Sequence, residues 1–110
     1  MSIFYDLDTG RPSEVVSGLR RRISSFTRHG SVRRFKIGIT NNPERRYIQA
    51  YATSYDEMLV LYESSSIDCV SELESELVEH NWNCCDNLLA GGGGGIGRTS
   101  PYFLYVVIKH

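Results

Sequence analysis

The sequence predicts a single α+β domain over residues 1–110, built on a small mixed or antiparallel sheet of three to four strands flanked by helices. Two long segments, about 13–28 and 67–81, carry apolar residues at helical spacing, and short apolar stretches between and after them have strand character. The strands and helices do not alternate in the regular order that gives a parallel sheet, which favours the α+β class.

The N-terminal part of the chain is expected to form a short strand and a long helix. IFYDL at 3–7 has strand composition and is followed by the turn residues Asp8-Thr9-Gly10. A helix capped by Ser13 and closed by Gly30 then carries Arg20-Arg21-Arg22 on its polar side. Its apolar positions recur at helical spacing: Val15, Val16, Leu19, Ile23 and Phe26.

The middle of the chain predicts a strand followed by a short helix. Phe35, Ile37 and Ile39 alternate with more polar or small residues, as in a strand with one buried face. Asn42 is placed to cap a helix that Pro43 opens and that continues to about Ala50.

The rest of the chain predicts two strands and one helix. The continuous apolar run at 58–63 indicates a strand buried on both faces, and helix 67–81 follows it, with Ser65 and Asp68 spaced as a capping box. The glycine-rich stretch 83–101 is expected to be a loop, and YFLYVVI at 102–108 a buried strand.

Charge is segregated along the chain. Residues 1–50 hold ten Lys/Arg against four Asp/Glu, whereas residues 51–110 hold two against nine. A basic half is typical of a protein that binds a phosphate-rich partner such as DNA or RNA, although a solvated mixed surface is the alternative. The candidates for contacts with a nucleic-acid backbone are Arg33, Arg34, Arg45 and Arg98.

Cysteine content and the lack of targeting features predict an intracellular protein in a reducing compartment, cytoplasm or nucleus. Cys69, Cys84 and Cys85 cannot all pair with one another, and adjacent cysteines seldom bridge. A zinc half-site of His80 with the cysteine pair is disfavoured because no CxxC is present, so buried free cysteine is the preferred interpretation. No segment is long and apolar enough for a membrane span, and no secretory signal is recognisable.

Glu74 breaks the pattern of the second long helix. At about 100° per residue its side chain falls within the apolar arc, between Val70 and Val78, whereas the other glutamates of the helix fall on the opposite side. A carboxylate on a core-facing arc has to be paired, protonated or bound to a cation. A buried salt bridge to an arginine is the structural alternative to a divalent metal or phosphate-binding site.

Several spaced segments together resemble the GIY-YIG nuclease domain, most closely the branch with K-I-G in place of Y-I-G. The likeness covers about residues 35–108, so that 1–34 would be a divergent N-terminal strand and helix, without a clear first tyrosine motif. The matching segments are KIGIT (36–40), NNPERR (41–46), MLVLY (58–62), LESELV (73–78) and CDNLLAGG (85–92).

The resemblance implies a divalent-metal-dependent nuclease, a phosphodiesterase acting on DNA or RNA with Mg²⁺ or Mn²⁺ as cofactor. It implies Arg46 as the catalytic arginine and Glu74 as the metal ligand. Lys36 replaces the second tyrosine, and Tyr5 could supply the missing phenol if the N-terminal helix is inserted between two strands of one hairpin.

Gly38 and Asn87 are the structural residues of the likeness. Gly38 would let backbone or substrate approach the strand closely, and Asn87 would tie the loop after the second long helix to the core. The alternative functions are a catalytically degenerate module that binds nucleic acid or a small phosphorylated ligand, and, less favoured, a protein-interaction module. With one small domain, a homodimer or a partner protein would be needed for extended target recognition.

Overall fold

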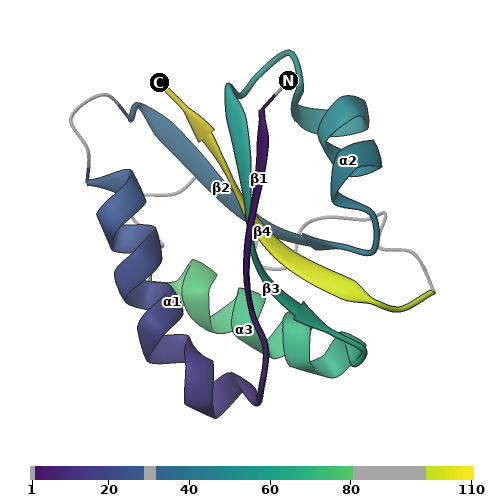
Figure 1. Ribbon diagram of the computed structural model, residues 1–110. Helices are drawn as coiled ribbons and strands as arrows, with labels where there is room; N and C mark the ends of the chain where they lie inside the picture. The colour runs from purple at the N-terminus through teal and green to yellow at the C-terminus, as the bar shows by residue number, and fades with distance from the viewer. Residues whose placement is uncertain (1, 29–31, 81–98) are drawn as a thin grey trace.

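The computed structural model describes residues 2–28, 32–80 and 99–110, and it confirms the α+β class (Figure 1). Four strands form one sheet, three helices pack on it, and a π-helical turn continues the shortest helix. In chain order the elements are β1 (Ile3–Asp8), α1 (Pro12–Thr27), β2 (Arg34–Thr40), α2 (Pro43–Arg46), η1 (Tyr47–Tyr51), β3 (Glu57–Ser64), α3 (Ile67–His80) and β4 (Tyr102–Lys109). None of the described helices combines the length and apolar character needed to cross a lipid bilayer.

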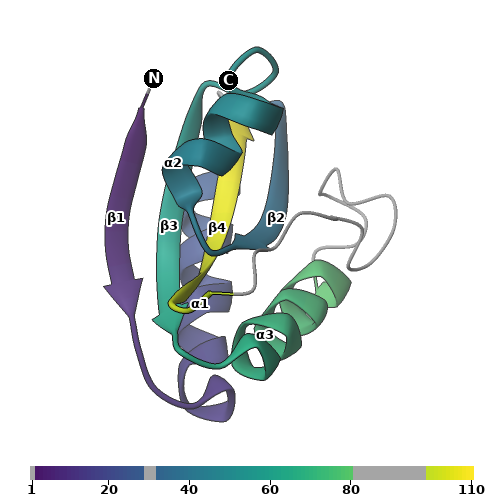
Figure 2. The same ribbon diagram turned by 90° about the vertical axis from the view of Figure 1, so that its right-hand side faces the viewer.

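The sheet is mixed, and its strand order is β1-β3-β4-β2. β4 lies in the interior and pairs antiparallel with both β2 and β3, while β1 adds to β3 in parallel at the edge. Figure 2 shows the four strands side by side in this order, with β1 and β2 at opposite edges. The last strand of the chain therefore holds the sheet together.

The two faces of the sheet carry separate apolar clusters, because alternate residues of each strand point to opposite sides. The larger cluster packs α1 and α3 on one face, and it includes Leu19, Ile23, Phe35, Ile37, Leu61, Val70, Leu73, Leu77, Leu104, Val106 and Ile108. The smaller cluster lies under α2 and η1 and consists of Tyr47, Tyr51, Met58, Val60, Tyr105 and Val107. Three of its six members are tyrosines, so this face is lined with hydroxyl groups as well as aromatic rings.

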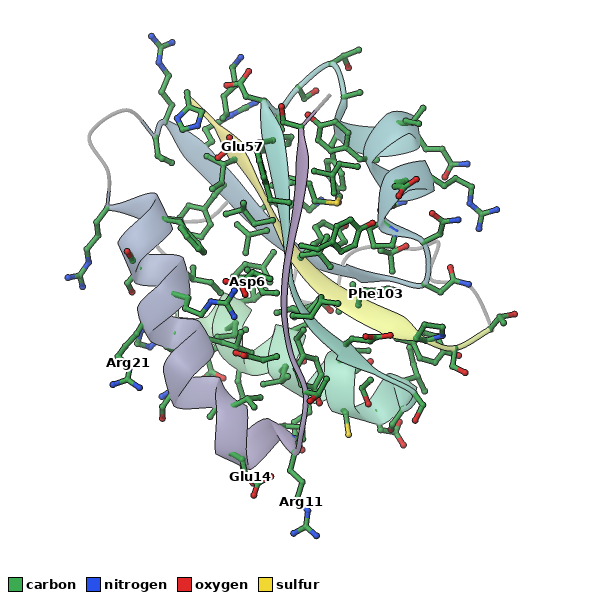
Figure 3. All side chains as sticks on the ribbon, in the orientation of Figure 1. Asp6, Arg11, Glu14, Arg21, Glu57 and Phe103 are labelled. Carbon is green, nitrogen blue, oxygen red and sulfur yellow. The ribbon has the colours of Figure 1, made fainter. Side chains whose placement is uncertain are left out.

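Helix α1 begins two residues before the position expected from Ser13. Arg11 is the N-cap residue, Pro12 opens the helix, and the Glu14 carboxylate accepts a hydrogen bond from the Arg11 backbone N–H at 3.2 Å. Figure 3 shows Arg11 and Glu14 together at this end of the helix. The prediction of a Ser13 cap was wrong because proline in the first turn, which needs no N–H donor, fixes the start instead.

The starts of the other helices are set by side-chain caps. The Asn42 side chain accepts from the Arg45 backbone N–H at 3.0 Å, which confirms the predicted cap of α2. The helix then passes into the π-helical turn η1 rather than continuing as regular α-helix to Ala50. At α3 the cap is Ser66, whose hydroxyl accepts from the Cys69 N–H at 3.4 Å, so the predicted Ser65–Asp68 capping box was wrong by one residue.

Candidate functional site

Two cationic side chains share one tyrosine ring on the face covered by α2 and η1. The guanidinium carbon of Arg46 lies 5.6 Å from the ring centre of Tyr51, and the Lys36 ammonium lies 5.7 Å from the same centre. Both cations are half-buried, whereas the Tyr51 ring is buried. A cation held over an aromatic face is attracted by the ring quadrupole, so Tyr51 fixes both positive groups in one place.

Gly38 makes room for a second buried tyrosine. It lies directly opposite Tyr105 in the β2–β4 pair, and a Cβ at Gly38 would overlap the Tyr105 hydroxyl and ring. The Tyr105 hydroxyl in turn lies 2.7 Å from the Tyr51 hydroxyl. The group that comes close to Gly38 is therefore the side chain of Tyr105, and not the backbone or substrate that the sequence predicted.

Hydrogen bonding raises the pKa of Arg46 in this cluster, and burial raises the pKa of Tyr105. Partial burial lowers the pKa of Arg46, but hydrogen bonds to the Tyr105 and Tyr51 side chains outweigh it, and the pKa is raised overall. Burial, together with the neighbouring Tyr51, raises the pKa of Tyr105 far above its usual value. At neutral pH Tyr105 is therefore a hydroxyl that hydrogen-bonds to its neighbours and does not act as a phenolate.

Glu74 is buried on α3, as its place on the apolar arc predicts, with 8 % of its surface exposed. Burial raises the pKa of its carboxyl, and the positive charge of Lys36 opposes that rise. Within the described residues the carboxylate makes no ion pair and no hydrogen bond, so the alternative of a buried salt bridge to an arginine is not realised there. Among the described residues, Lys36 is the charged group that acts on the Glu74 carboxyl.

Arg46 and Glu74 lie in the two layers on opposite faces of the sheet, and each is linked to Lys36: Arg46 shares the Tyr51 ring with it, and the charge of Lys36 opposes the rise in the pKa of Glu74. α2 covers the tyrosine-lined face and α3 covers the other face, while Lys36 lies on the edge strand β2 between them. We call Arg46, Lys36, Tyr51 and Tyr105 the tyrosine–cation cluster, with Glu74 as its acidic neighbour. Of the four predicted catalytic and metal-binding residues, Arg46 and Lys36 share the Tyr51 ring, and Glu74 is linked to them through the charge of Lys36.

Tyr5, the fourth, lies at the other edge of the sheet. The expected hairpin between its strand and the Gly38 strand was wrong, because β1 pairs with β3 and is separated from β2 by three strand spacings, about 14 Å. The Tyr5 side chain is 47 % exposed, and its hydroxyl lies 3.5 Å from a carboxylate oxygen of Glu44. Burial and the Glu44 charge raise the pKa of Tyr5. The strand that pairs with the Gly38 strand is β4, and its residue opposite Gly38 is Tyr105.

The arginines predicted to contact a nucleic-acid backbone are distributed over several surfaces. Arg34 lies over the Tyr55 ring at 5.4 Å from its centre, near the tyrosine–cation cluster. Arg45 and Arg33 are exposed, on α2 and just before β2. Arg98 and Asn87 lie outside the described residues, as do Cys84 and Cys85.

Sequence reasoning missed Tyr105 and assigned no role to Tyr51. The signal available for Tyr105 was the segment FLY at 103–105, which repeats the pattern of IFY at 3–5. Two tyrosines, Tyr5 and Tyr105, therefore end similar apolar segments. Which of them lies near Gly38 depends on which strand pairs with β2. Tyr51 follows the expected end of the helix at Ala50, and the π-helical turn places its ring under the guanidinium of Arg46.

The donor set around Glu74 suits a hard divalent cation that keeps most of its own water. In the described part of the chain no three His, Cys, Asp or Glu side chains gather into a metal-binding group. Mg²⁺ is commonly held by one or two carboxylates plus substrate phosphate oxygens, and it dehydrates reluctantly. A single buried carboxylate with a raised pKa and no partner among these residues is compatible with that mode, because a cation would compensate its burial.

Comparison of the chain with protein-family models, with curated proteins and with solved structures gave no match.

Proposed function

We propose that the protein is a divalent-metal-dependent nuclease of the GIY-YIG type, which cleaves phosphodiester bonds of DNA or RNA at the tyrosine–cation cluster. The observation that supports this most directly is the pair of half-buried cations, Arg46 and Lys36, held on one buried tyrosine ring, with the charge of Lys36 also acting on the buried carboxyl of Glu74. Two fixed positive groups suit a phosphodiester, which carries negative charge on its non-bridging oxygens. The resemblance of residues 35–108 to this nuclease domain points to the same residues.

Arg46 would bind and polarise the phosphate. Its planar guanidinium offers two parallel N–H donors to phosphate oxygens, and it stays charged through the pH range of the reaction. Lys36 would add a second positive charge on the side nearest Glu74. Donors that are already in place when charge develops on the phosphoryl oxygens lower the barrier without reorganising.

Glu74 would hold the Mg²⁺ or Mn²⁺ ion. When bound, such an ion supplies positive charge for the attacking or leaving oxygen of the displacement. The described residues contribute this one carboxylate, so phosphate oxygens and water would complete the coordination.

Tyr105 would act as a positioning residue. With 1 % of its surface exposed it does not face solvent, but its hydroxyl hydrogen-bonds Tyr51 and supports Arg46. Loss of this hydroxyl should let the guanidinium move while leaving its charge unchanged. The expected effect of Tyr105→Phe is a fall in cleavage of about tenfold, with substrate binding less affected.

The first test is cleavage of plasmid DNA, single-stranded DNA and RNA by the purified protein with Mg²⁺, Mn²⁺ or EDTA. We expect cutting that requires the ion and that falls by about 10²–10³-fold in Arg46→Ala, the loss typical for removing one donor to developing charge. Arg45→Ala removes the same charge from the exposed side of the same helix and should cost only a few-fold.

A second pair of variants tests the metal ligand. Glu74→Gln should abolish ion-dependent cutting, whereas Glu72→Gln, which removes a carboxylate from the exposed side of α3, should not. Tyr5→Phe should cut at close to the wild-type rate, because the Tyr5 hydroxyl bonds the exposed carboxylate of Glu44 on α2 and not the cations of the cluster. Equal loss in Tyr5→Phe and Tyr105→Phe would contradict the proposed site.

A binding module without cleavage is the second candidate, and the burial of Tyr105 favours it. In this structure the phenol nearest Arg46 is covered and neutral, so it offers no exposed base to a water molecule. Binding of nucleic acid in EDTA, lost in Arg46→Ala, together with no cutting at any ion concentration, would support this alternative over the nuclease.

A further inference from the structure

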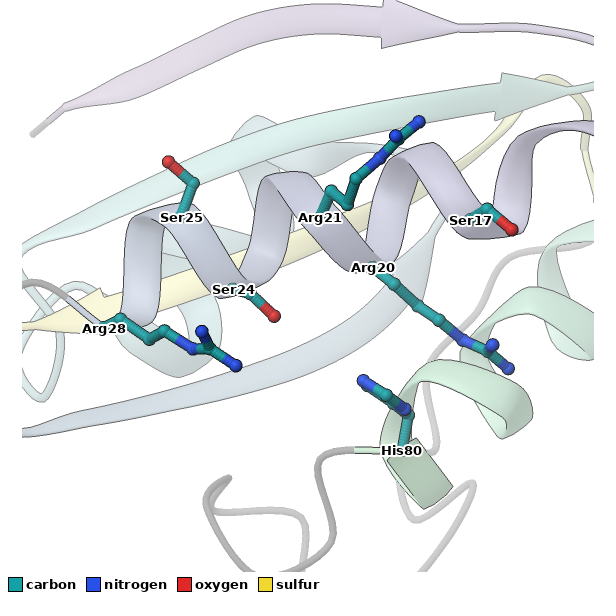
Figure 4. Close-up of a pocket in the computed structure, with 7 residues that line it drawn as sticks. All are labelled: Ser17, Arg20, Arg21, Ser24, Ser25, Arg28 and His80. Atoms are coloured by element: carbon teal, nitrogen blue, oxygen red, sulfur yellow. The ribbon is translucent and has the colours of Figure 1, made fainter.

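A hollow of about 620 Å³ lies between α1 and the end of α3, away from the tyrosine–cation cluster. Its lining is basic and hydroxylic: three arginines and three serines come from α1 and its C-cap residue Arg28, and one histidine comes from the end of α3 (Figure 4). α1 belongs to the layer on the opposite face of the sheet from α2. The proposed nuclease site makes no use of this surface.

Four of the lining side chains converge on the side of α1 that faces α3. Arg20, Ser24 and Arg28 follow one another at intervals of four residues, so they lie along one side of the helix. In Figure 4 these three side chains and His80 point into the same space, while Arg21 and Ser25 point to the other side of the helix. We call the four converging residues the arginine groove.

The arginines of the groove lack the acidic partners that Arg22 has within the described residues. Arg22 pairs with Asp6 and Asp8 at 3.0 Å each, which ties α1 to β1. Within the described residues neither Arg20 nor Arg28 makes an ion pair. The Nε atom of Arg20 is buried and has no hydrogen-bond partner among the described residues, so one donor of this side chain is left unsatisfied there. An unsatisfied buried donor costs free energy that an acceptor ligand would recover.

We propose that the arginine groove binds the phosphodiester backbone of a single-stranded nucleic acid, as a second contact separate from the tyrosine–cation cluster. Eight residues of helix place the backbones of Arg20 and Arg28 about 12 Å apart, a span that suits successive phosphates of a strand better than one small anion. Guanidinium groups donate in pairs to phosphate oxygens, and the Ser24 hydroxyl between them can donate a further hydrogen bond.

Carboxylates lie along one side of the groove and limit the path that a nucleic-acid strand can take. Glu76 and Glu79 line an adjoining hollow together with Arg20 and His80. Their charges would repel a polyanion from that hollow. On the other side, Arg28 lines a further hollow with Thr27 and Arg33, so positive charge continues toward the start of β2. A bound single-stranded nucleic acid would therefore run along α1 toward Arg33.

The test is binding of a fluorescently labelled single-stranded oligonucleotide, measured by anisotropy in EDTA over a range of salt concentrations. We expect Arg20→Ala/Arg28→Ala to bind at least tenfold more weakly than wild type at about 0.1 M salt. The slope of log K against log salt should fall by about 1.4, since each phosphate contact contributes about 0.7 for single strands. Arg21→Ala, which removes a charge on the other side of the helix, should stay within about twofold.

Three outcomes would overturn the proposal. The first is that the wild-type protein does not bind the oligonucleotide. The second is that Arg21→Ala weakens binding as much as the single variants Arg20→Ala and Arg28→Ala do. The third is that pyrophosphate displaces the oligonucleotide at an ionic strength where sodium chloride has no effect. The last would assign the groove to a small polyphosphate. Ser24→Asp, which puts a negative charge between the arginines, should weaken binding even if the double variant does not fold. Because the assay contains no metal ion, failure of the cleavage proposal does not affect its result.

Discussion

At the scale of single residues, Gly38 shows how tightly the site is packed. The ring of its cross-strand partner Tyr105 occupies the space where any other residue would place its Cβ. Sequence analysis gave this glycine the role of admitting a substrate or backbone. The side chain of Tyr105 fills this space, so the need for glycine at position 38 is explained without a ligand.

Gly38→Ala should therefore destabilise the protein. Overpacking of a buried site costs about 1–3 kcal/mol, and here the displaced group also supports Arg46. Gly18→Ala is the matched control, because a Cβ at Gly18 meets nothing within 4 Å and alanine favours the helix by about 0.5–1 kcal/mol. Urea unfolding of both variants checks the prediction, and equal effects of the same sign would contradict it.

Glu74 predicts an unusual dependence of stability on pH. Burial raises its pKa in the folded protein above the value in the unfolded chain. Between these two pKa values the folded protein keeps a proton that the unfolded chain has released, so stability falls as pH rises through that window. The penalty is complete above the folded pKa and absent below the unfolded one.

Glu74→Gln should remove this penalty. We expect the variant to be more stable than wild type by about 1–2 kcal/mol at pH 8, the order of the cost of an uncompensated buried polar group, and nearly equal to it at pH 3. Urea unfolding in EDTA at the two pH values is the measurement. A stability difference that does not change with pH would show that Glu74 is not titrating in the core.

At the scale of elements, local sequence signals predicted where helices and strands occur but not always where they begin. Asn42 and Pro43 form an unambiguous helix start, and the structure confirms it. Three consecutive serines precede α3, each chemically able to cap, and only the path of the chain out of β3 selects Ser66. The π-helical turn at 47–51 had no local signal, since it depends on packing two tyrosines against the sheet.

The Asn42 cap is expected to matter for Arg46 as well as for stability. Asn42→Ala leaves the Arg45 N–H without its partner and should cost about 1 kcal/mol. Because α2 is only one turn long, the same change should loosen Arg46 and weaken nucleic-acid binding. Asn42→Asp keeps an acceptor and should restore both, as followed by thermal unfolding and anisotropy. Loss of stability without loss of binding would separate the cap from the site.

At the scale of the whole molecule, the strand order is the property that sequence could not supply. Alternation shows which residues of a strand share a face, but it does not say which strand lies alongside. Strand 102–108 was predicted, and its place between β2 and β3 was not. For this reason Glu74 could be selected from helical periodicity and Arg46 and Lys36 from the resemblance, whereas Tyr105 was not considered and Tyr5 was named as the candidate phenol.

The interior position of β4 predicts a large difference between two charge substitutions. Val106→Asp puts a carboxylate in a fully buried site of the interior strand and should cost more than about 4 kcal/mol, a large part of the stability of a small domain. Phe4→Asp puts the same charge at a half-exposed position of edge strand β1 and should cost about 1 kcal/mol. Circular dichroism and urea unfolding distinguish them, and similar losses would argue against this strand order.

The strand order also has a consequence for folding during synthesis on the ribosome. The strand synthesised last of the four enters the middle of the sheet, so until residues 102–109 emerge, both of its future neighbours present unpaired backbone along one side. Such open edges are the places where nascent chains associate wrongly or recruit chaperones. Folding is therefore expected to follow translation of this segment, and a stalled chain ending before it should be degraded by proteases that spare the finished product.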